Sequence, residues 1–89
     1  MTVYDNPALQ RFELQEKGLI AFANYQRSGQ RVVIPHVEAP HALRGTGTAS
    51  RLMAGIVAMA RAEGFKITPT CSYAAVWFRR HKDAEDVLV

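Results

Sequence analysis

Cysteine and long apolar runs are nearly missing from this sequence, and both shortages exclude classes of protein. The one cysteine, Cys71, has no partner for an internal disulfide, which favours a reducing, cytoplasmic location. No apolar run approaches the roughly 20 residues of a membrane-spanning helix, and residues 1–10 lack the basic-then-apolar pattern of a signal peptide. The histidines and Cys71 stand at no zinc-finger spacing, so we expect no metal site.

Clustered charge is also missing. The net charge is +3, from 11 Lys and Arg residues against 8 Asp and Glu, but like charges form no long block. A nucleic-acid-binding domain of this size usually carries a basic stripe, so that class is disfavoured and a small anion such as a phosphate is the better match. With 48% apolar residues in 89 positions, the chain can form one thin core. We therefore expect a single domain over residues 1–89.

Alternating polar and apolar residues predict three strands in the first half of the chain. These strands are expected at residues 10–15, 19–25 and 31–38, separated by a Lys-Gly turn and a glycine-containing loop. Short connections of this kind join antiparallel neighbours, so the pattern predicts a meander. Pro35 interrupts the third strand and predicts either an edge strand or a bulge there.

The hydrophobic period changes to that of a helix after residue 48. One apolar stripe at helical spacing consists of Ala49, Leu52, Met53, Ile56, Val57 and Ala60. Thr46 or Thr48 is a candidate N-cap, and Gly64 is placed to end the helix. A short strand at 66–68 and a short helix at 74–81 are expected to follow. The strand-helix-strand order makes the third and fourth strands parallel, so the expected fold is α+β or α/β with a mixed sheet.

A glycine-containing loop, residues 44–48, lies between the third strand and the long helix. Gly45 and Gly47 allow a ligand to approach the backbone closely, and the N–H groups of the following helix carry partial positive charge. Such a loop can hold a phosphate or pyrophosphate. The alternative is an ordinary turn, because two glycines alone carry little information. The loop matches neither the P-loop nor the dinucleotide-binding fingerprint.

At this loop the sequence resembles the GNAT N-acetyltransferase superfamily, whose acetyl-CoA loop reads Gln/Arg-x-x-Gly-x-Gly/Ala. Ala42 stands where Gln or Arg is usual. The resemblance is closer to a minimal, single-domain GNAT-like group of predicted acetyltransferases. Two motifs of that group match fully: L-R-G-x-G at residues 43–47 and P-x-C-x-Y at residues 69–73. The motif H-T-E-V-P matches residues 36–40 in part, and R-x-H-P matches residues 79–82 except at Lys82.

The resemblance implies a GNAT-like mixed sheet in which the third and fourth strands splay apart around an acetyl thioester. It implies that acetyl-CoA is bound and that its acetyl group is moved to an amine. The loop residues that would bind acetyl-CoA are Arg44, Gly45, Thr46, Gly47 and Thr48.

The same resemblance assigns four residues to the chemistry. Cys71 would lie near the acetyl group, where it either takes the acetyl group covalently or only lines the site. His36 and Glu38 are candidates to deprotonate the amine, and Tyr73 is a candidate to protonate the leaving thiolate. Each also has a purely structural interpretation: a small buried thiol, a histidine on a sheet face, a solvated carboxylate and a packing aromatic.

The acceptor side of the site is expected to be open. Full-length GNAT enzymes have N-terminal helices that help wall the acceptor site, and a chain whose first strand is expected near residue 10 has no room for them. An open site suits a protein amine as the acceptor, or a site completed by the second subunit of a homodimer. It equally suits an alternative function, a CoA- or acyl-CoA-binding regulatory module without turnover.

Overall fold

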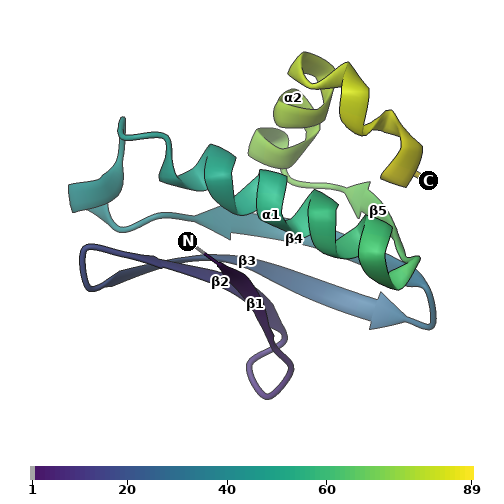
Figure 1. The fold of residues 1–89 in the computed structure, drawn as a ribbon, viewed down its shortest axis with the longest axis horizontal. Coiled ribbons are helices and arrows are strands. Elements are labelled where there is room, and N and C mark those ends of the chain that lie inside the picture. Colours follow the sequence, from purple (N-terminus) through teal and green to yellow (C-terminus); the bar gives the residue numbers. More distant parts are fainter. Residues whose placement is uncertain (1) are drawn as a thin grey trace.

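The computed structural model describes residues 2–89, which form a five-stranded sheet with a layer of helices on one face (Figure 1). The strands are β1 (Val3–Asn6), β2 (Arg11–Glu16), β3 (Leu19–Ser28), β4 (Arg31–Glu38) and β5 (Lys66–Pro69), in that order across the sheet. The helices are α1 (Thr48–Glu63) and α2 (Ser72–Arg80), with short 3-10 helices η1 (His41–Leu43) and η2 (Lys82–Val87). Strands β1 to β4 are antiparallel neighbours, and β4 and β5 are parallel. The mixed sheet predicted from the sequence is confirmed.

The core lies between the sheet and α1. One face of the sheet is buried because β2, β3 and β4 place apolar side chains there at every second position: Phe12, Leu14, Ala21, Ala23, Val32 and Ile34. The predicted apolar stripe of α1 packs onto this face, and α2 adds Trp77 and Phe78 to the same cluster. Gly64 ends α1 in the left-handed conformation, as predicted.

Some boundaries differ from the prediction. The prediction that the first strand begins near residue 10 was wrong, because β1 precedes it and pairs with β2 in the register Val3 to Leu14. β1 has only four residues, too few to show a convincing alternation. β3 continues to Ser28, and α2 begins at Ser72 rather than Ala74.

Pro35 lies at a bulge in β4. Ile34 and Pro35 together stand opposite Tyr25 of β3, because the register shifts between the pairs Asn24–His36 and Gln26–Val33. β4 is an interior strand, so of the two alternatives the bulge was right and the edge strand was wrong. Proline has no N–H to give to a ladder, and a bulge is one of the few places where an interior strand accepts it.

The bulge is also the point where β4 and β5 part. The parallel ladder runs from Arg31–Lys66 to Ile34–Pro69 and ends there. The Ile34 carbonyl accepts hydrogen bonds from the N–H groups of Thr70 and Cys71, at 3.1 and 3.3 Å, as the chain leaves β5. Beyond Pro35, β4 continues beside β3 alone. The expected splay between the two parallel strands is therefore present.

The contact between α1 and β1 generates a stability prediction. A Cβ atom added at Gly55 would overlap Cγ2 of Val3 and lie 2.7 Å from Cβ of Val3. Gly55→Ala should therefore lower the free energy of unfolding by about 1–3 kcal/mol, the usual cost of overpacking, although alanine is the better helix former. Urea denaturation measures the change.

The control for this prediction is the same substitution in a Val3→Ala background. Removing the two γ-methyl groups relieves part of the overlap, so Gly55→Ala should cost clearly less there. An equal cost in both backgrounds would contradict the explanation.

Candidate functional site

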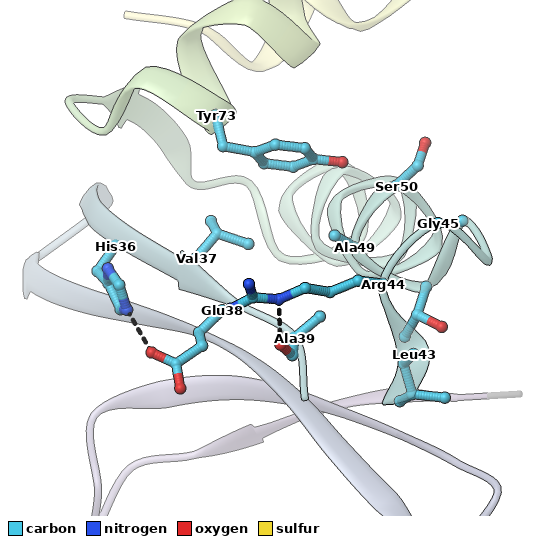
Figure 2. A pocket seen from close by; sticks show the side chains of 12 residues that line it. His36, Val37, Glu38, Ala39, Leu43, Arg44, Gly45, Ala49, Ser50 and Tyr73 are labelled. Carbon is cyan, nitrogen blue, oxygen red and sulfur yellow. Dashed lines mark hydrogen bonds and ion pairs between the residues drawn. The ribbon is translucent and has the colours of Figure 1, made fainter. Parts of the chain in front are cut away.

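A cavity of about 410 Å³ lies beyond the point where β4 and β5 part, between the end of β4 and the N-terminus of α1 (Figure 2). Its volume is within the range typical of small-molecule sites. It is lined by His36, Val37, Glu38, Ala39, Leu43, Arg44, Gly45, Gly47, Thr48, Ala49, Ser50 and Tyr73. Seven of the nine predicted site residues are in this lining, and Thr46 and Cys71 are not.

The glycine loop reaches the cavity with its backbone. Gly45 and Gly47 both have positive φ angles, +78° and +86°, a conformation that residues with a Cβ atom rarely adopt. Gly47 is the N-cap of α1, and no side chain within residues 2–89 makes a capping hydrogen bond there. The prediction that Thr46 or Thr48 caps the helix was wrong, because both hydroxyls bond elsewhere. The N–H groups at the start of α1 therefore stay available to an anion.

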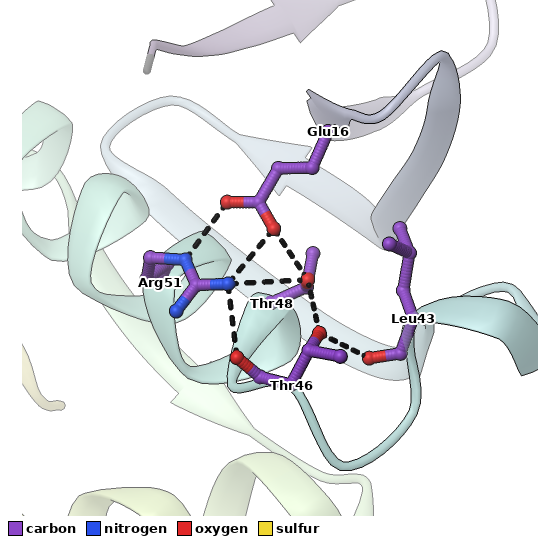
Figure 3. Close-up of polar contacts among 5 residues, drawn as sticks. All are labelled: Glu16, Leu43, Thr46, Thr48 and Arg51. Carbon is purple, nitrogen blue, oxygen red and sulfur yellow. Dashed lines mark hydrogen bonds and ion pairs between the residues drawn. The ribbon is translucent and has the colours of Figure 1, made fainter.

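The threonine hydroxyls belong to a network behind the loop (Figure 3). Thr48 donates to Oε1 of Glu16, and Arg51 makes two ion-pair contacts to the same carboxylate, at 2.8 and 2.9 Å. Arg51 also donates to the carbonyl of Thr46 at 3.0 Å, and Thr46 donates to the carbonyl of Leu43. Glu16 is a site residue that sequence reasoning missed, since nothing in a pattern of spacing connects it to a loop about thirty residues later.

The network changes the titration of Glu16. The hydrogen bonds from Arg51, and then from Thr48, lower the pKa of the Glu16 carboxyl from 4.5 to about 2, although partial burial acts in the opposite direction. The carboxylate is consequently charged at every pH at which the protein is expected to work.

His36 and Glu38 lie on the face of β4 that points away from α1. Their strand partners are Asn24 and Phe22, whereas Val37 between them pairs with the buried Ala23. Nε2 of His36 and Oε1 of Glu38 are 2.9 Å apart, and both side chains are about half exposed. Figure 2 shows Val37 pointing toward Tyr73 while His36 and Glu38 lie at the opposite rim of the cavity. The structure thus brings the two predicted base candidates together as a pair.

Tyr73 covers the other side of the cavity. It lies in the first turn of α2, is 40% exposed, and reaches over the cavity toward the start of α1 (Figure 2). Partial burial raises the pKa of the Tyr73 hydroxyl above its usual 10.0, so it carries its proton at neutral pH. One turn later, Nε1 of Trp77 donates to Oγ of Ser50 at 2.9 Å. This bond ties α2 to the first turn of α1 and fixes the spacing of the cavity walls.

Cys71 is the N-cap of α2. Its Sγ accepts a hydrogen bond from the backbone N–H of Ala74 at 3.3 Å, and the half-buried side chain packs against the core. The backbone N–H of Cys71 bonds to the Ile34 carbonyl, at the end of the parallel ladder. Cys71 therefore lies at the junction of the two parting strands, and its contacts are structural.

Comparison with known proteins identifies the family of this chain. A sequence model of the GCN5-related N-acetyltransferase family matches residues 11–87, and the chain therefore belongs to that family. The solution NMR structure of a GCN5-like protein from Staphylococcus aureus has the same fold, with a TM-score of 0.74 at 22% sequence identity. The match covers 98% of this chain and 86% of that one. A search of curated proteins found no significant match.

The described part of the chain contains neither a candidate membrane-spanning helix nor a candidate metal site. None of its helices has the length and apolar character needed to cross a bilayer. No three His, Cys, Asp or Glu side chains in residues 2–89 gather in a way that could hold a metal ion.

The lowered pKa of Glu16 predicts a specific dependence of stability on pH. The native carboxyl titrates at about 2 and the unfolded one near 4.5, so its contribution is complete above 4.5 and is lost as the pH falls toward 2. Denaturant unfolding across this range should show a steeper loss of stability in the wild type than in Glu16→Gln. Parallel curves for the two proteins would contradict the prediction.

Proposed function

We propose that this protein transfers an acetyl group from acetyl-CoA to an amine that enters from the uncovered face of the sheet. Membership of the N-acetyltransferase family supports the reaction class. The observation that carries the proposal is the arrangement of the cavity, which joins the uncapped N-terminus of α1, the Tyr73 hydroxyl and the His36–Glu38 pair. These three features supply an anion site, an acid and a base around one space.

The glycine loop fits the pyrophosphate of CoA. The α1 N–H groups and the positive end of the helix dipole stabilise negative charge, and the two glycines keep Cβ atoms out of the way. Arg44 lines the same cavity, and its side chain adds a positive charge that is free of carboxylate partners in the described chain. The first turn of α1 contains no acidic residue to repel the phosphates.

In the proposed chemistry, His36 accepts the proton that the amine loses as its nitrogen bonds to the acetyl carbon. Glu38 holds the imidazole through the 2.9 Å contact and balances its positive charge. Tyr73, which is protonated at neutral pH, gives its proton to the sulfur of CoA as the carbon–sulfur bond breaks. The products are an acetylated amine and free CoA.

The direction of approach supports a large acceptor. No helix of residues 2–89 covers the face of the sheet that carries His36 and Glu38, and Phe22 and Ile20 lie partly exposed on that face. An amine on a protein surface or on a peptide can reach this pair without entering a closed pocket. We therefore propose a protein or peptide amine as the acceptor class.

A covalent route through Cys71 is the alternative mechanism for the same reaction. In that route the Cys71 sulfur takes the acetyl group and then passes it to the amine. The contacts of Cys71 favour the direct route, because Sγ already accepts a bond from the Ala74 N–H and lies outside the lining of the cavity.

Cofactor binding can be tested at Gly45. Gly45→Glu places a carboxylate where the phosphates are expected, and like charges in contact cost several kcal/mol, so CoA affinity should fall by about 100-fold or more. Isothermal titration calorimetry with CoA measures the loss.

The matched control is Gly29→Glu. Gly29 also has a positive φ angle, +61°, and like Gly45 has no heavy atom within 4 Å of an added Cβ, but it lies in the turn between β3 and β4. It should carry the same backbone strain and bind CoA as the wild type does. Unchanged affinity in a folded Gly45→Glu variant would refute the loop assignment.

The two chemical routes make opposite predictions for Cys71 and His36. In the direct route, Cys71→Ala keeps most of the activity, whereas His36→Ala loses roughly 100-fold or more, the usual contribution of a general base. The assay is acetyl-CoA-dependent CoA release with a panel of amines and lysine-containing peptides, with mass spectrometry to detect an acetyl adduct on Cys71.

The reverse pattern, an inactive Cys71→Ala and an acetylated Cys71 in the wild type, would establish the covalent route. Tight CoA binding without transfer to any acceptor in the panel would favour the other function considered above, a CoA-binding regulatory module.

A further inference from the structure

We propose that Glu16 of β2 and Arg51 of α1 act as positioning residues, which hold the glycine loop in the conformation that binds the CoA pyrophosphate. We call this pair, together with its hydrogen bonds to Thr46 and Thr48, the Glu16–Arg51 clasp. The inference rests on the proposed function and assigns to it two residues outside the loop motif.

The pairing geometry of the clasp is bidentate. Nε and Nη2 of Arg51 lie 2.8 and 2.9 Å from the two carboxylate oxygens of Glu16 (Figure 3). The planar guanidinium matches a carboxylate in this arrangement, which adds direction to the electrostatic attraction. The Glu16 side chain is only 9% exposed, so solvent competes weakly for its oxygens.

The clasp holds both ends of the segment that contains the two glycines. At one end, Thr48 donates to Glu16, and its side chain is almost fully buried. In the middle, Nη2 of Arg51 donates to the Thr46 carbonyl at 3.0 Å. At the other end, the Thr46 hydroxyl bonds to the Leu43 carbonyl and lies 3.0 Å from the Thr48 hydroxyl.

Fixing the Thr46 carbonyl also fixes the next N–H group. A trans peptide is planar and directs its carbonyl and its N–H to opposite sides. When Arg51 holds the Thr46 oxygen on its own side, the Gly47 N–H is directed away from Arg51. Gly47 lines the cavity and Arg51 does not. The bond to Arg51 therefore sets the orientation of a backbone donor at the cavity.

The charge of Arg51 is used for positioning and not for phosphate binding. A cation in the first turn of a helix opposes the helix dipole, and here the carboxylate of Glu16 compensates for it. The other titratable group that faces Glu16 is Lys17 of the adjoining turn, whose charge acts in the same sense. With the pKa of Glu16 at about 2, the clasp stays charged throughout the neutral range.

The position of Arg51 in the clasp is a second constraint that favours glycine at position 47. An added Cβ at this position would lie 2.9 Å from Nη1 of Arg51, in addition to the strain of its positive φ angle. Glycines give a loop wide conformational freedom. Without the clasp, ligand binding would have to select one conformation from many, which lowers the apparent affinity.

The test compares Glu16→Gln and Arg51→Met with a matched control, Asp86→Asn. Arg61 and Asp86 form a second bidentate pair, at 2.8 and 2.9 Å, at the other end of the same helix. Calorimetry should show the CoA affinity lowered about tenfold in Glu16→Gln and Arg51→Met. This is the loss expected if only about a tenth of the molecules keep the loop in the conformation that binds CoA. Asp86→Asn should bind CoA as the wild type does, and Arg51→Lys should recover part of the loss.

Two further readouts separate positioning from a general loss of stability. The amides of Thr46 and Arg51 are hydrogen-bonded to the carbonyls of Leu43 and Gly47. Their hydrogen exchange should accelerate about tenfold in Glu16→Gln while exchange in β3 and β4 stays unchanged. The KM for acetyl-CoA should rise with kcat at saturation unchanged, because the reacting groups are intact.

The proposal is overturned if folded Glu16→Gln binds CoA normally, or if Asp86→Asn weakens binding equally. If the wild type itself fails to bind CoA, the proposed function is refuted, and hydrogen exchange alone decides on the clasp. Unchanged exchange of the loop in Glu16→Gln would then overturn it.

Discussion

The site depends on the two prolines at which the parallel ladder stops. Pro69 ends β5, and Pro35 follows directly after Ile34, its last partner on β4. Since proline has no N–H to donate, the hydrogen bonding between these strands cannot continue in register. The chain turns the Thr70 and Cys71 N–H groups onto the Ile34 carbonyl instead. The backbone beyond this point is free of β5 and becomes the wall of the cavity.

The residues of the two proposed halves of the reaction come from opposite faces of the sheet and meet at the rim of one cavity. The α1 face holds the glycine loop and Tyr73, and the opposite face presents His36 and Glu38. A strand alternates its side chains between faces, so neighbouring residues of β4 can serve a buried core and an open acceptor side at once. A chain of 89 residues can in this way form a two-sided site with a single layer of helices.

The cavity is assembled from bonds between elements that are distant in the sequence. Glu16 holds the loop before α1, and Trp77 of α2 holds Ser50 of α1. Both contacts use one buried or nearly buried partner, and such polar groups are costly to leave without a partner. The geometry of the loop and the width of the cavity are therefore linked to the integrity of the whole fold.

The sequence by itself determined the strand order from residue 11 onward, the extent of α1 and the glycine loop, because periodicity, Gly64 and the paired glycines act locally. The resemblance of its short motifs to a known family also predicted His36, Glu38, Arg44 and Tyr73 as site residues. Only the tertiary structure decided that Pro35 is a bulge inside the sheet, that β1 pairs with β2, and that Glu16 reaches Arg51 and Thr48. These features depend on contacts between residues far apart in the chain, and a local pattern contains no information about which distant partner will satisfy a given charge or hydrogen bond.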